Sequence, residues 1–192
     1  VYSYTTVSSN GCDSTIILDL TILNQIGGRW VQLGQDIDGQ SAGDFFGLSV
    51  IFSSDGTRIA VAADFNDANG NNAGHVRVYD WNSNSWIQAG QDILGEAAND
   101  LFGSSVAFSS DGNRLAIGAI FNDASGNDAG HVRVYDWDGS FWVQVGQDID
   151  GELAGDHFGR SVSFSSNGNH LAIGAPYNDG NGNGSGHVRV YD

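Results

Sequence analysis

The apolar and polar positions of this sequence fall into four short runs that return again and again along the chain. The runs read "GSSVAFS", "RLAIGA", "HVRVYDW" and "WIQAGQDI", and segments rich in Gly, Asn, Asp and Ser separate them. Alternation of apolar with small or polar residues over such short stretches is the pattern of β-strands, and the intervening residues favour turns. Each set of four runs therefore predicts a four-stranded antiparallel meander.

The meander repeats three times with a constant period and no insertion. Trp30, Trp86 and Trp142 are 56 residues apart and begin the three units. The same interval separates further triplets: Asp36, Asp92 and Asp148; Phe46, Phe102 and Phe158; Gly74, Gly130 and Gly186. A fixed period of this size indicates one supersecondary unit per repeat, stacked on its neighbours.

Both faces of the predicted strands are apolar or small. Within "RLAIGA", Leu115, Ile117 and Ala119 share one face, while Ala116 and Gly118 share the other. Sheets that pack on both faces at this period are typical of a β-propeller. We therefore predict an all-β fold, a β-propeller built of four-stranded antiparallel blades in three 56-residue repeats, with an N-terminal β-strand segment. A β-sandwich is the alternative architecture.

Two stretches carry a family resemblance. "DLFGSSVAFSSDGNRLAIGA" and "AGHVRVYDW" resemble FG-GAP repeats, the blade units of integrin-type β-propellers and of many bacterial surface proteins, over roughly residues 30 to 192. The resemblance implies a cell-surface or extracellular role in adhesion. Many FG-GAP blades carry a D-x-D-x-D-G calcium loop, but the corresponding positions here read "SSDGTR", "SSDGNR" and "SSNGNH". The calcium site usual in that family is therefore absent.

The first 25 residues form a different unit. "STIILDLTI" alternates as an amphipathic strand, and "NGCDSTIILDLTI" resembles the closing strand of Ig-like repeats in bacterial adhesins. Cys12 has no second Cys in the chain, so a disulfide partner elsewhere and a free thiol both stay open. Residues 24–29 read as a short linker. We expect residues 1–25 to be the end of an Ig-like module or an assembly strand, and residues 26–192 to be the propeller repeats.

Charge narrows the possible partners. The formal net charge is −16, with seven Arg and no Lys. An acidic surface repels nucleic acid and anionic membranes, so we expect neither partner, and it attracts cations. No apolar run is long enough to span a bilayer, so we expect no membrane insertion. The chain begins with Val and lacks Met, and we interpret it as a mature or partial chain.

The loop before each "GHVRVYD" run has oxygen-bearing residues at the spacing of a calcium-binding loop. Its oxygen-bearing residues recur at alternate positions, and the Gly sits at the fourth position with no Glu to close the loop. These loops predict weak calcium sites, with Asp123 to Asp128 the best of the three, or else polar turns that use left-handed conformations. The candidate ligands are Asp67, Asn69, Asn71, Asp123, Ser125, Asn127, Asp128, Asp179, Asn181 and Asn183. We expect no required cofactor, with weak Ca²⁺ binding left open.

Other polar residues recur once per repeat and so predict structural roles. His75, His131 and His187 open the third strands, where we expect them to hydrogen-bond a turn. The Arg two positions later is expected to pair with a carboxylate such as Asp80 or Asp136. The Asp before each Phe-Gly pair is expected to be a solvated loop carboxylate: Asp44, Asp100 and Asp156. Asn183 begins the sole N-x-S/T sequon and is a candidate glycosylation site.

No pattern predicts catalysis. Ser residues recur in the "FSSDG" hairpins, and the lone Cys lies outside the repeats. We expect a non-enzymatic extracellular or cell-surface module, structural or adhesive, that assembles through unpaired strand edges into an oligomer or filament, or that binds another surface protein or glycan. Three blades are too few for a closed propeller, so a longer propeller, a two-chain six-bladed ring and an open filament all stay possible. The alternative function is a calcium-dependent propeller that binds a glycan or protein.

Overall fold

The computed structural model describes residues 4–7, 13–16 and 30–192, which fall into two compact units, Val1–Leu33 and Gly34–Asp192. In the first unit, β1 (Tyr4–Val7) and β2 (Asp13–Ile16) form an antiparallel hairpin with Val7 opposite Asp13. The remainder of the predicted "STIILDLTI" strand, Cys12 and the linker lie outside the described residues.

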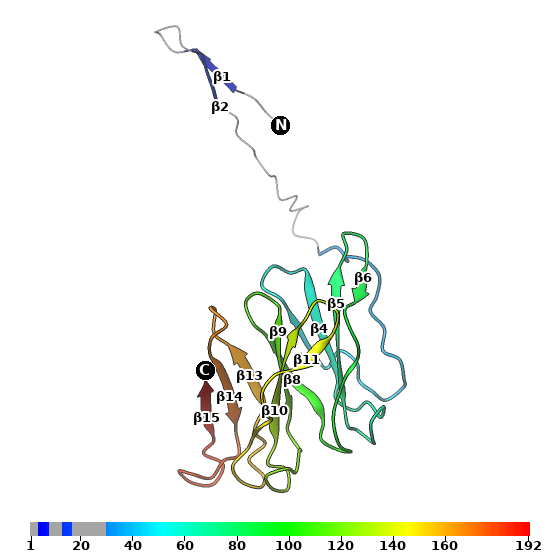
Figure 1. The fold of residues 1–192 in the computed structure, drawn as a ribbon, viewed down its shortest axis with the longest axis vertical. Helices are drawn as coiled ribbons and strands as arrows, with labels where there is room; N and C mark the ends of the chain where they lie inside the picture. The colour runs from blue at the N-terminus through cyan, green and yellow to red at the C-terminus, as the bar shows by residue number, and fades with distance from the viewer. Residues whose placement is uncertain (1–3, 8–12, 17–29) are drawn as a thin grey trace. The chain divides into compact units, whose positions relative to one another are not determined.

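The second unit consists of three antiparallel sheets that follow one another along the chain (Figure 1). Its described residues contain no helix, and hence none that is long and apolar enough to cross a membrane. The first sheet has the order β3-β4-β5-β6 with β7 also paired to β5, the second repeats this as β8-β9-β10-β11 with β12 paired to β10, and the third is β13-β14-β15. The bounds are β3 Ser49–Phe52, β4 Arg58–Ala63, β5 His75–Trp81, β6 Trp86–Gln88, β7 Ile93–Leu94, β8 Phe102–Phe108, β9 Arg114–Ala119, β10 His131–Trp137, β11 Trp142–Gln144, β12 Ile149–Asp150, β13 Ser161–Phe164, β14 Leu171–Ala175 and β15 His187–Tyr191.

The prediction of one continuous fourth strand is wrong. The run "WIQAGQDI" is divided into β6 and β7, and both pieces pair with β5, with Tyr79 opposite Gln88 and Val76 opposite Ile93. Gly90 lies between the two pieces at φ 80°, a conformation that interrupts an extended strand. The equivalent residues Trp30 to Ile37 of the first repeat are not in a strand at all.

Neighbouring sheets pack through unlike faces. The small face of one sheet, rich in Ala, Gly and Val, meets the aromatic face of the next, rich in Phe, Trp, Tyr and Leu. Between the first two sheets the core contains Ala60, Val76 and Val78 on the small side against Phe102 and Leu115 on the aromatic side. Between the second and third sheets the same arrangement recurs. The predicted burial of both faces of "RLAIGA" is confirmed, because Leu115, Ala116, Ile117 and Ala119 are all fully buried.

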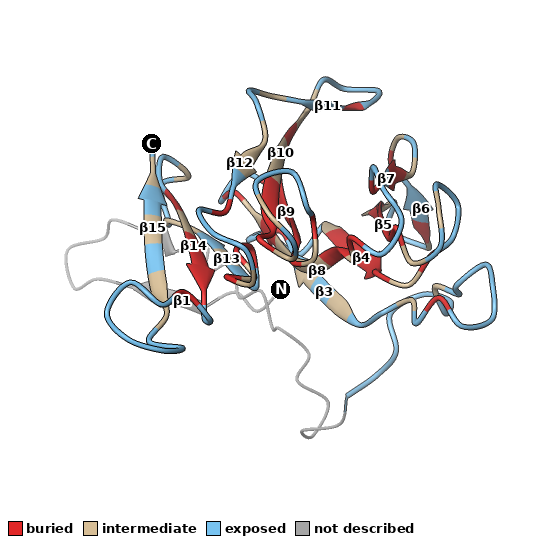
Figure 2. Cartoon of the chain, turned by 90° about the horizontal axis from the view of Figure 1, so that it is seen from below, coloured by how far each residue is buried: buried red, intermediate tan, exposed pale blue. Residues whose placement is uncertain are grey.

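The first strand of each sheet lies next to the first strand of its neighbour. β8 contacts β3 and β4 on one side and β13 on the other. Figure 2, viewed along the sheets, shows β3, β8 and β13 near the centre, with β6, β11 and β15 towards the outside. The sheets therefore diverge outward from their first strands.

Glycine permits the closest approach between repeats. Gly130 adopts φ 78°, and a Cβ placed on it would lie 2.2 Å from the carbonyl oxygen of Phe158 in the next repeat. The Phe158 N–H in turn donates to the Ala129 carbonyl over 2.9 Å, just as the Phe102 N–H donates to Ala73 over 3.0 Å. The Phe of the second and third Phe-Gly pairs is thus held by a backbone hydrogen bond to the preceding repeat.

Candidate functional site

A cluster of titratable groups lies where the second sheet meets the segment that follows the first sheet. β10 begins at His131, and Arg133 lies two residues further on the same face. Asp148 precedes β12, and Glu96 follows β7. The Arg133 guanidinium donates to Asp148 Oδ2 over 2.8 Å and also contacts Glu96, so one cation joins two carboxylates. Because Glu96 belongs to the segment between the first two sheets, the ion pair ties consecutive sheets together.

Burial controls the protonation of this cluster. The His131 side chain is almost completely buried, and burial, helped by the Arg133 charge, lowers its pKa to about 4. Burial works to raise the pKa of Asp148, but the hydrogen bond and charge of Arg133 outweigh it, and the pKa is lowered. At neutral pH the cluster therefore holds a neutral His131 imidazole beside the ionised Arg133–Asp148 pair.

His131, Glu96 and Asp148 have donor atoms within 4.8 Å of one another, the one such cluster among the described His, Cys, Asp and Glu residues. Neutral imidazole with two carboxylates is a donor set that divalent cations accept. However, Arg133 already lies between the two carboxylates, so a metal ion would have to displace the guanidinium. The arrangement is that of a partly buried ion pair beside a buried imidazole.

The cluster recurs with one change in each repeat. In the first sheet Arg77 donates to Asp92 over 2.6 Å, and Gln40 replaces the Glu. In the third sheet Arg189 contacts Glu152. The expectation that the strand Arg pairs with Asp80 or Asp136 is wrong. An odd spacing along a strand places Arg77 and Asp80 on opposite faces, and Asp80 pairs instead with Arg58 over 2.6 Å.

The repeated His residues do not hydrogen-bond a turn in this structure. Neither ring nitrogen of His75 or His131 has a hydrogen-bond partner among the described residues, and both rings are buried. Phe46 contacts His75 edge-on, with 6.3 Å between ring centroids. The His75 imidazole therefore packs as an aromatic ring against Phe46 of its own repeat, contrary to the expectation.

The Asp before each Phe-Gly pair is buried, so the prediction of solvated carboxylates is wrong. Asp44, Asp100 and Asp156 are each no more than 4% exposed. Asn122 donates to Asp100 over 2.8 Å, and the same Asn–Asp pair occurs in the other repeats. Burial raises the pKa of Asp100, although its hydrogen bond from Asn122 opposes the shift. This Asn–Asp pair could have been predicted from the sequence, because both residues recur in every repeat at a fixed separation.

The predicted calcium loops are engaged in turn and inter-repeat hydrogen bonds. The first Asp of each loop accepts a backbone N–H five residues on: Asp67 from Asn72, Asp123 from Asp128, and Asp179 from Gly184. Ser125 donates to the Gly151 carbonyl over 2.7 Å, and Asn69 donates to the Gly95 carbonyl over 2.8 Å. The other Asn candidates in these loops are exposed: Asn71, Asn127, Asn181 and Asn183. The side chains of Asn71 and Asn127 donate to the Asn99 and Asp128 side chains, and their backbone carbonyls accept N–H groups from the following repeat. Weak calcium binding at these loops stays a prediction.

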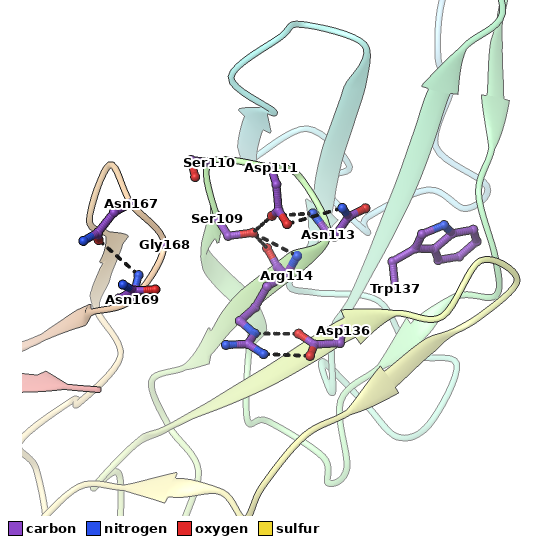
Figure 3. Close-up of a pocket in the computed structure, with 10 residues that line it drawn as sticks. All are labelled: Ser109, Ser110, Asp111, Asn113, Arg114, Asp136, Trp137, Asn167, Gly168 and Asn169. Atoms are coloured by element: carbon purple, nitrogen blue, oxygen red, sulfur yellow. Dashed lines mark hydrogen bonds and ion pairs between the residues drawn. The ribbon is translucent and has the colours of Figure 1, made fainter.

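A polar cavity of about 410 Å³ lies between the β8–β9 and β13–β14 hairpins. Figure 3 shows Arg114 paired with Asp136, 2.6 Å apart, and Ser109 directed at Asp111. A similar cavity of about 310 Å³ lies one repeat earlier, where the Arg58 guanidinium lies 5.0 Å from the centre of the Trp137 ring. Each cavity is large enough for a small polar ligand. Because Ser109 bonds to a carboxylate with no His beside it, the cavity has no activated nucleophile.

Comparison with known families bears on this repeated arrangement. A model described as "FG-GAP repeat" matches residues 95–135 and 149–191, which cover β8 to β10 and β12 to β15. Two segments of this chain are therefore similar to the FG-GAP repeat. No Ig-like match precedes them, so that part of the resemblance stays a prediction. The sequence has no match among curated proteins.

Three solved structures are similar to this chain at low identity. They are the Kuenenia stuttgartiensis hydrazine synthase (16% identity, 74% of this chain and 44% of that chain, TM-score 0.44), a putative 6-phosphogluconolactonase from Bacteroides uniformis (15%, 98% and 49%, TM-score 0.45) and the Pyrococcus horikoshii acylaminoacyl peptidase (16%, 74% and 23%, TM-score 0.40). The chain spans less than half of the length of each of them.

Proposed function

We propose that this chain is a non-enzymatic extracellular or cell-surface module, structural or adhesive, whose three sheets are successive blades of a β-propeller. The observation that carries the proposal is the repeated interface. The small face of one sheet packs on the aromatic face of the next in both places where two sheets meet. Adjacent first strands at the centre and outward divergence of the sheets support a propeller over a sandwich.

The two FG-GAP repeats support a role at the surface, since such repeats are typical of extracellular and surface proteins. The recurring Arg residues of the third strands and the recurring Asp before each Phe-Gly pair are occupied in ion pairs and in buried Asn–Asp pairs, which is the use expected of a scaffold. A net charge of −16 favours solubility and opposes binding to anionic membranes.

A binding assay tests the proposal: the immobilised chain is presented to panels of glycans and extracellular proteins. We expect retention of at least one class of surface ligand, unchanged by a chelator, together with no turnover on hydrolase substrate panels. Turnover that disappears in a point variant would overturn the non-enzymatic part. Absence of retention on every panel would overturn the adhesive part.

The second candidate is calcium-dependent ligand binding, and one loop favours it. Asp123 and Asp128 place two carboxylates in the loop before β10, whereas each of the other two loops has one. Calorimetric titration with Ca²⁺ decides the matter, with Asp128→Asn as the matched control. Heat and a rise in melting temperature that the control loses would support this candidate. No heat and an unchanged melting temperature would remove it.

A further inference from the structure

The cavity of about 310 Å³ between the first and second sheets is built by the hairpin turns of two consecutive repeats. The turn between β3 and β4 supplies Asp55, the end of β5 supplies Asp80 and Trp81, and the turn between β8 and β9 closes the other side. The Ser54 hydroxyl donates to the Ser110 carbonyl, which fixes the two turns against each other. A cavity at the lower end of the size range of ligand sites suits a ligand no larger than one sugar ring.

Asp80 is held in a single position inside this cavity. Arg58 donates to its two carboxylate oxygens over 2.6 and 2.9 Å, and to the Gly112 carbonyl of the next repeat over 3.0 Å. The guanidinium also lies 5.0 and 5.4 Å from the centres of the Trp137 and Trp142 rings. The Arg58 side chain is 12% exposed and the Asp80 side chain 44% exposed, so the carboxylate is the accessible member of the pair. A group fixed in this way loses little freedom when a ligand binds.

The hydrogen-bonding capacity of the cavity is unequal, because its donors are used within it while acceptors are left over. Ser53 and Thr57 donate to Asp55, and Arg58 donates to Asp80 and to a backbone carbonyl. Each oxygen of the Asp80 carboxylate accepts one N–H from Arg58 and has a further lone pair. A ligand that fits this cavity must therefore donate several hydrogen bonds, as the hydroxyl groups of a sugar do.

Charge selects among such ligands. Three carboxylates line the cavity, Asp55, Asp80 and Asp111, against the one guanidinium of Arg58, which leaves two negative charges in excess. Hydrogen bonds, the largest from the Ser53 hydroxyl, lower the pKa of Asp55 to about 2, so this carboxylate is ionised throughout the physiological range. An anionic ligand is repelled, because the single cation is already bonded to a carboxylate. A cationic group is attracted, since hydrogen bonds between opposite charges are stronger than neutral ones.

We propose that this cavity binds one sugar residue of a glycan through its hydroxyl groups, prefers positively charged amino sugars to neutral sugars, and excludes acidic sugars. The hydroxyl groups donate to Asp80 and Asp55, and the partly exposed Trp81 ring offers apolar surface to the C–H groups of the sugar. The proposal names the ligand of the adhesive role proposed above and rests on that role.

The cavity of about 410 Å³ in the following repeat carries the same site with one charge fewer (Figure 3). The positions that line the first cavity recur here 56 residues later, and the Arg114–Asp136 pair repeats the arrangement of Arg58 and Asp80. Asn167 takes the place that Asp111 has in the first cavity. The second cavity should therefore bind the same sugars with a weaker preference for the amino sugar.

Asn167 also shows that this charge can be removed without loss of the turn. Its side-chain oxygen accepts the Ser165 hydroxyl over 2.6 Å and the Asn169 N–H over 3.2 Å. The Asp55 carboxylate accepts the corresponding hydroxyl and N–H groups in the first repeat, over 2.7 and 3.0 Å. Asp55→Asn therefore removes one negative charge from the first cavity alone and keeps the turn.

NMR titration of the ¹⁵N-labelled chain with glucosamine, glucose and glucuronate tests the proposal, because these sugars share one ring and differ in charge. The amide of Thr57 reports on the first cavity and that of Asn169 on the second. We expect glucosamine to bind more tightly than glucose at both, and glucuronate to leave both signals unchanged. Asp55→Asn should lower the preference for glucosamine at Thr57 by about twofold to fivefold and leave that at Asn169 unchanged. Asp138→Asn is the matched control, because Asp138 accepts N–H groups in an exposed turn outside both cavities.

Signals that none of the three sugars shifts would overturn the inference. Glucuronate binding as tight as that of glucosamine would overturn it too, as would methylammonium that binds as tightly as glucosamine, since the cavity would then accept any small cation. A preference that Asp138→Asn lowers as much as Asp55→Asn would refute the assignment to the cavity. Failure of the proposed function is distinct: retention on protein panels without sugar binding contradicts only the cavity, and sugar binding without retention on any panel contradicts only the adhesive role.

Discussion

Adding a single methyl group at equivalent glycines measures how tightly consecutive repeats approach each other. Gly130 and Gly186 both have positive φ, 78° and 68°, so Ala costs about 1–2 kcal/mol of backbone strain at either position. At Gly130 the new Cβ would also lie 2.2 Å from the Phe158 carbonyl oxygen, whereas at Gly186 the nearest atom is the Pro176 oxygen at 3.0 Å. Phe158 cannot move freely, because its N–H is bonded to Ala129.

Overpacking of this kind costs about 1–3 kcal/mol, so Gly130→Ala should lower the free energy of unfolding by about 2–5 kcal/mol and Gly186→Ala by about 1–2 kcal/mol. Urea denaturation followed by Trp fluorescence measures both, at a concentration where the chain is monomeric. The m value should stay constant, because neither change alters the surface exposed on unfolding. Equal losses in the two variants would refute the close approach as the reason for Gly at this position.

Three further changes test the packing and the ion pairs. Phe102→Ala should lower the free energy of unfolding, measured by urea denaturation, by about 3–5 kcal/mol, because Phe102 is fully buried. Phe46→Ala should lower it clearly less, because Phe46 is only partly buried, and equal losses would contradict the burial pattern. Arg133→Met should destabilise the fold more than Arg114→Met, because Arg133 joins two carboxylates at 11% exposure while the Arg114 pair is exposed and worth about 0–1 kcal/mol. The pKa of His131 is about 4 in the fold and 6.5 when unfolded, so the unfolded chain binds more protons between these values, and stability should fall by on the order of 2–3 kcal/mol as pH drops from 6.5 to 4. His131→Gln should flatten that slope in unfolding titrations at stepped pH, and an unchanged slope would contradict the assignment.

The sequence predicted the strands and their faces well, because period-two alternation translates directly into which side chains share a face. Leu115 and Ile117 could be assigned to one face and Ala116 to the other without any knowledge of neighbouring sheets. The break in the fourth run was missed, since Gly90 is a single residue and its effect depends on the pairing of β5 with both flanking pieces.

Partners across the fold were harder to predict. Arg77 meets Asp92 only because β7 returns to β5 after the turn, and sequence proximity favoured Asp80 instead. The burial of Asp100 depends on Asn122, which comes from a loop two strands away. Residues that recur in every repeat identify such pairs as candidates, but only the arrangement of the sheets shows which of them meet.

The close contact at Gly130 also has a consequence for how such a gene can change over generations. Every junction between repeats uses the same glycine, the same Phe backbone and the same small and aromatic faces. An in-frame duplication or deletion of one 56-residue unit therefore adds or removes one sheet together with one complete junction, and no new contact has to evolve. The number of repeats can therefore change without loss of the ability to fold. Unequal recombination between near-identical units can change that number in a single step.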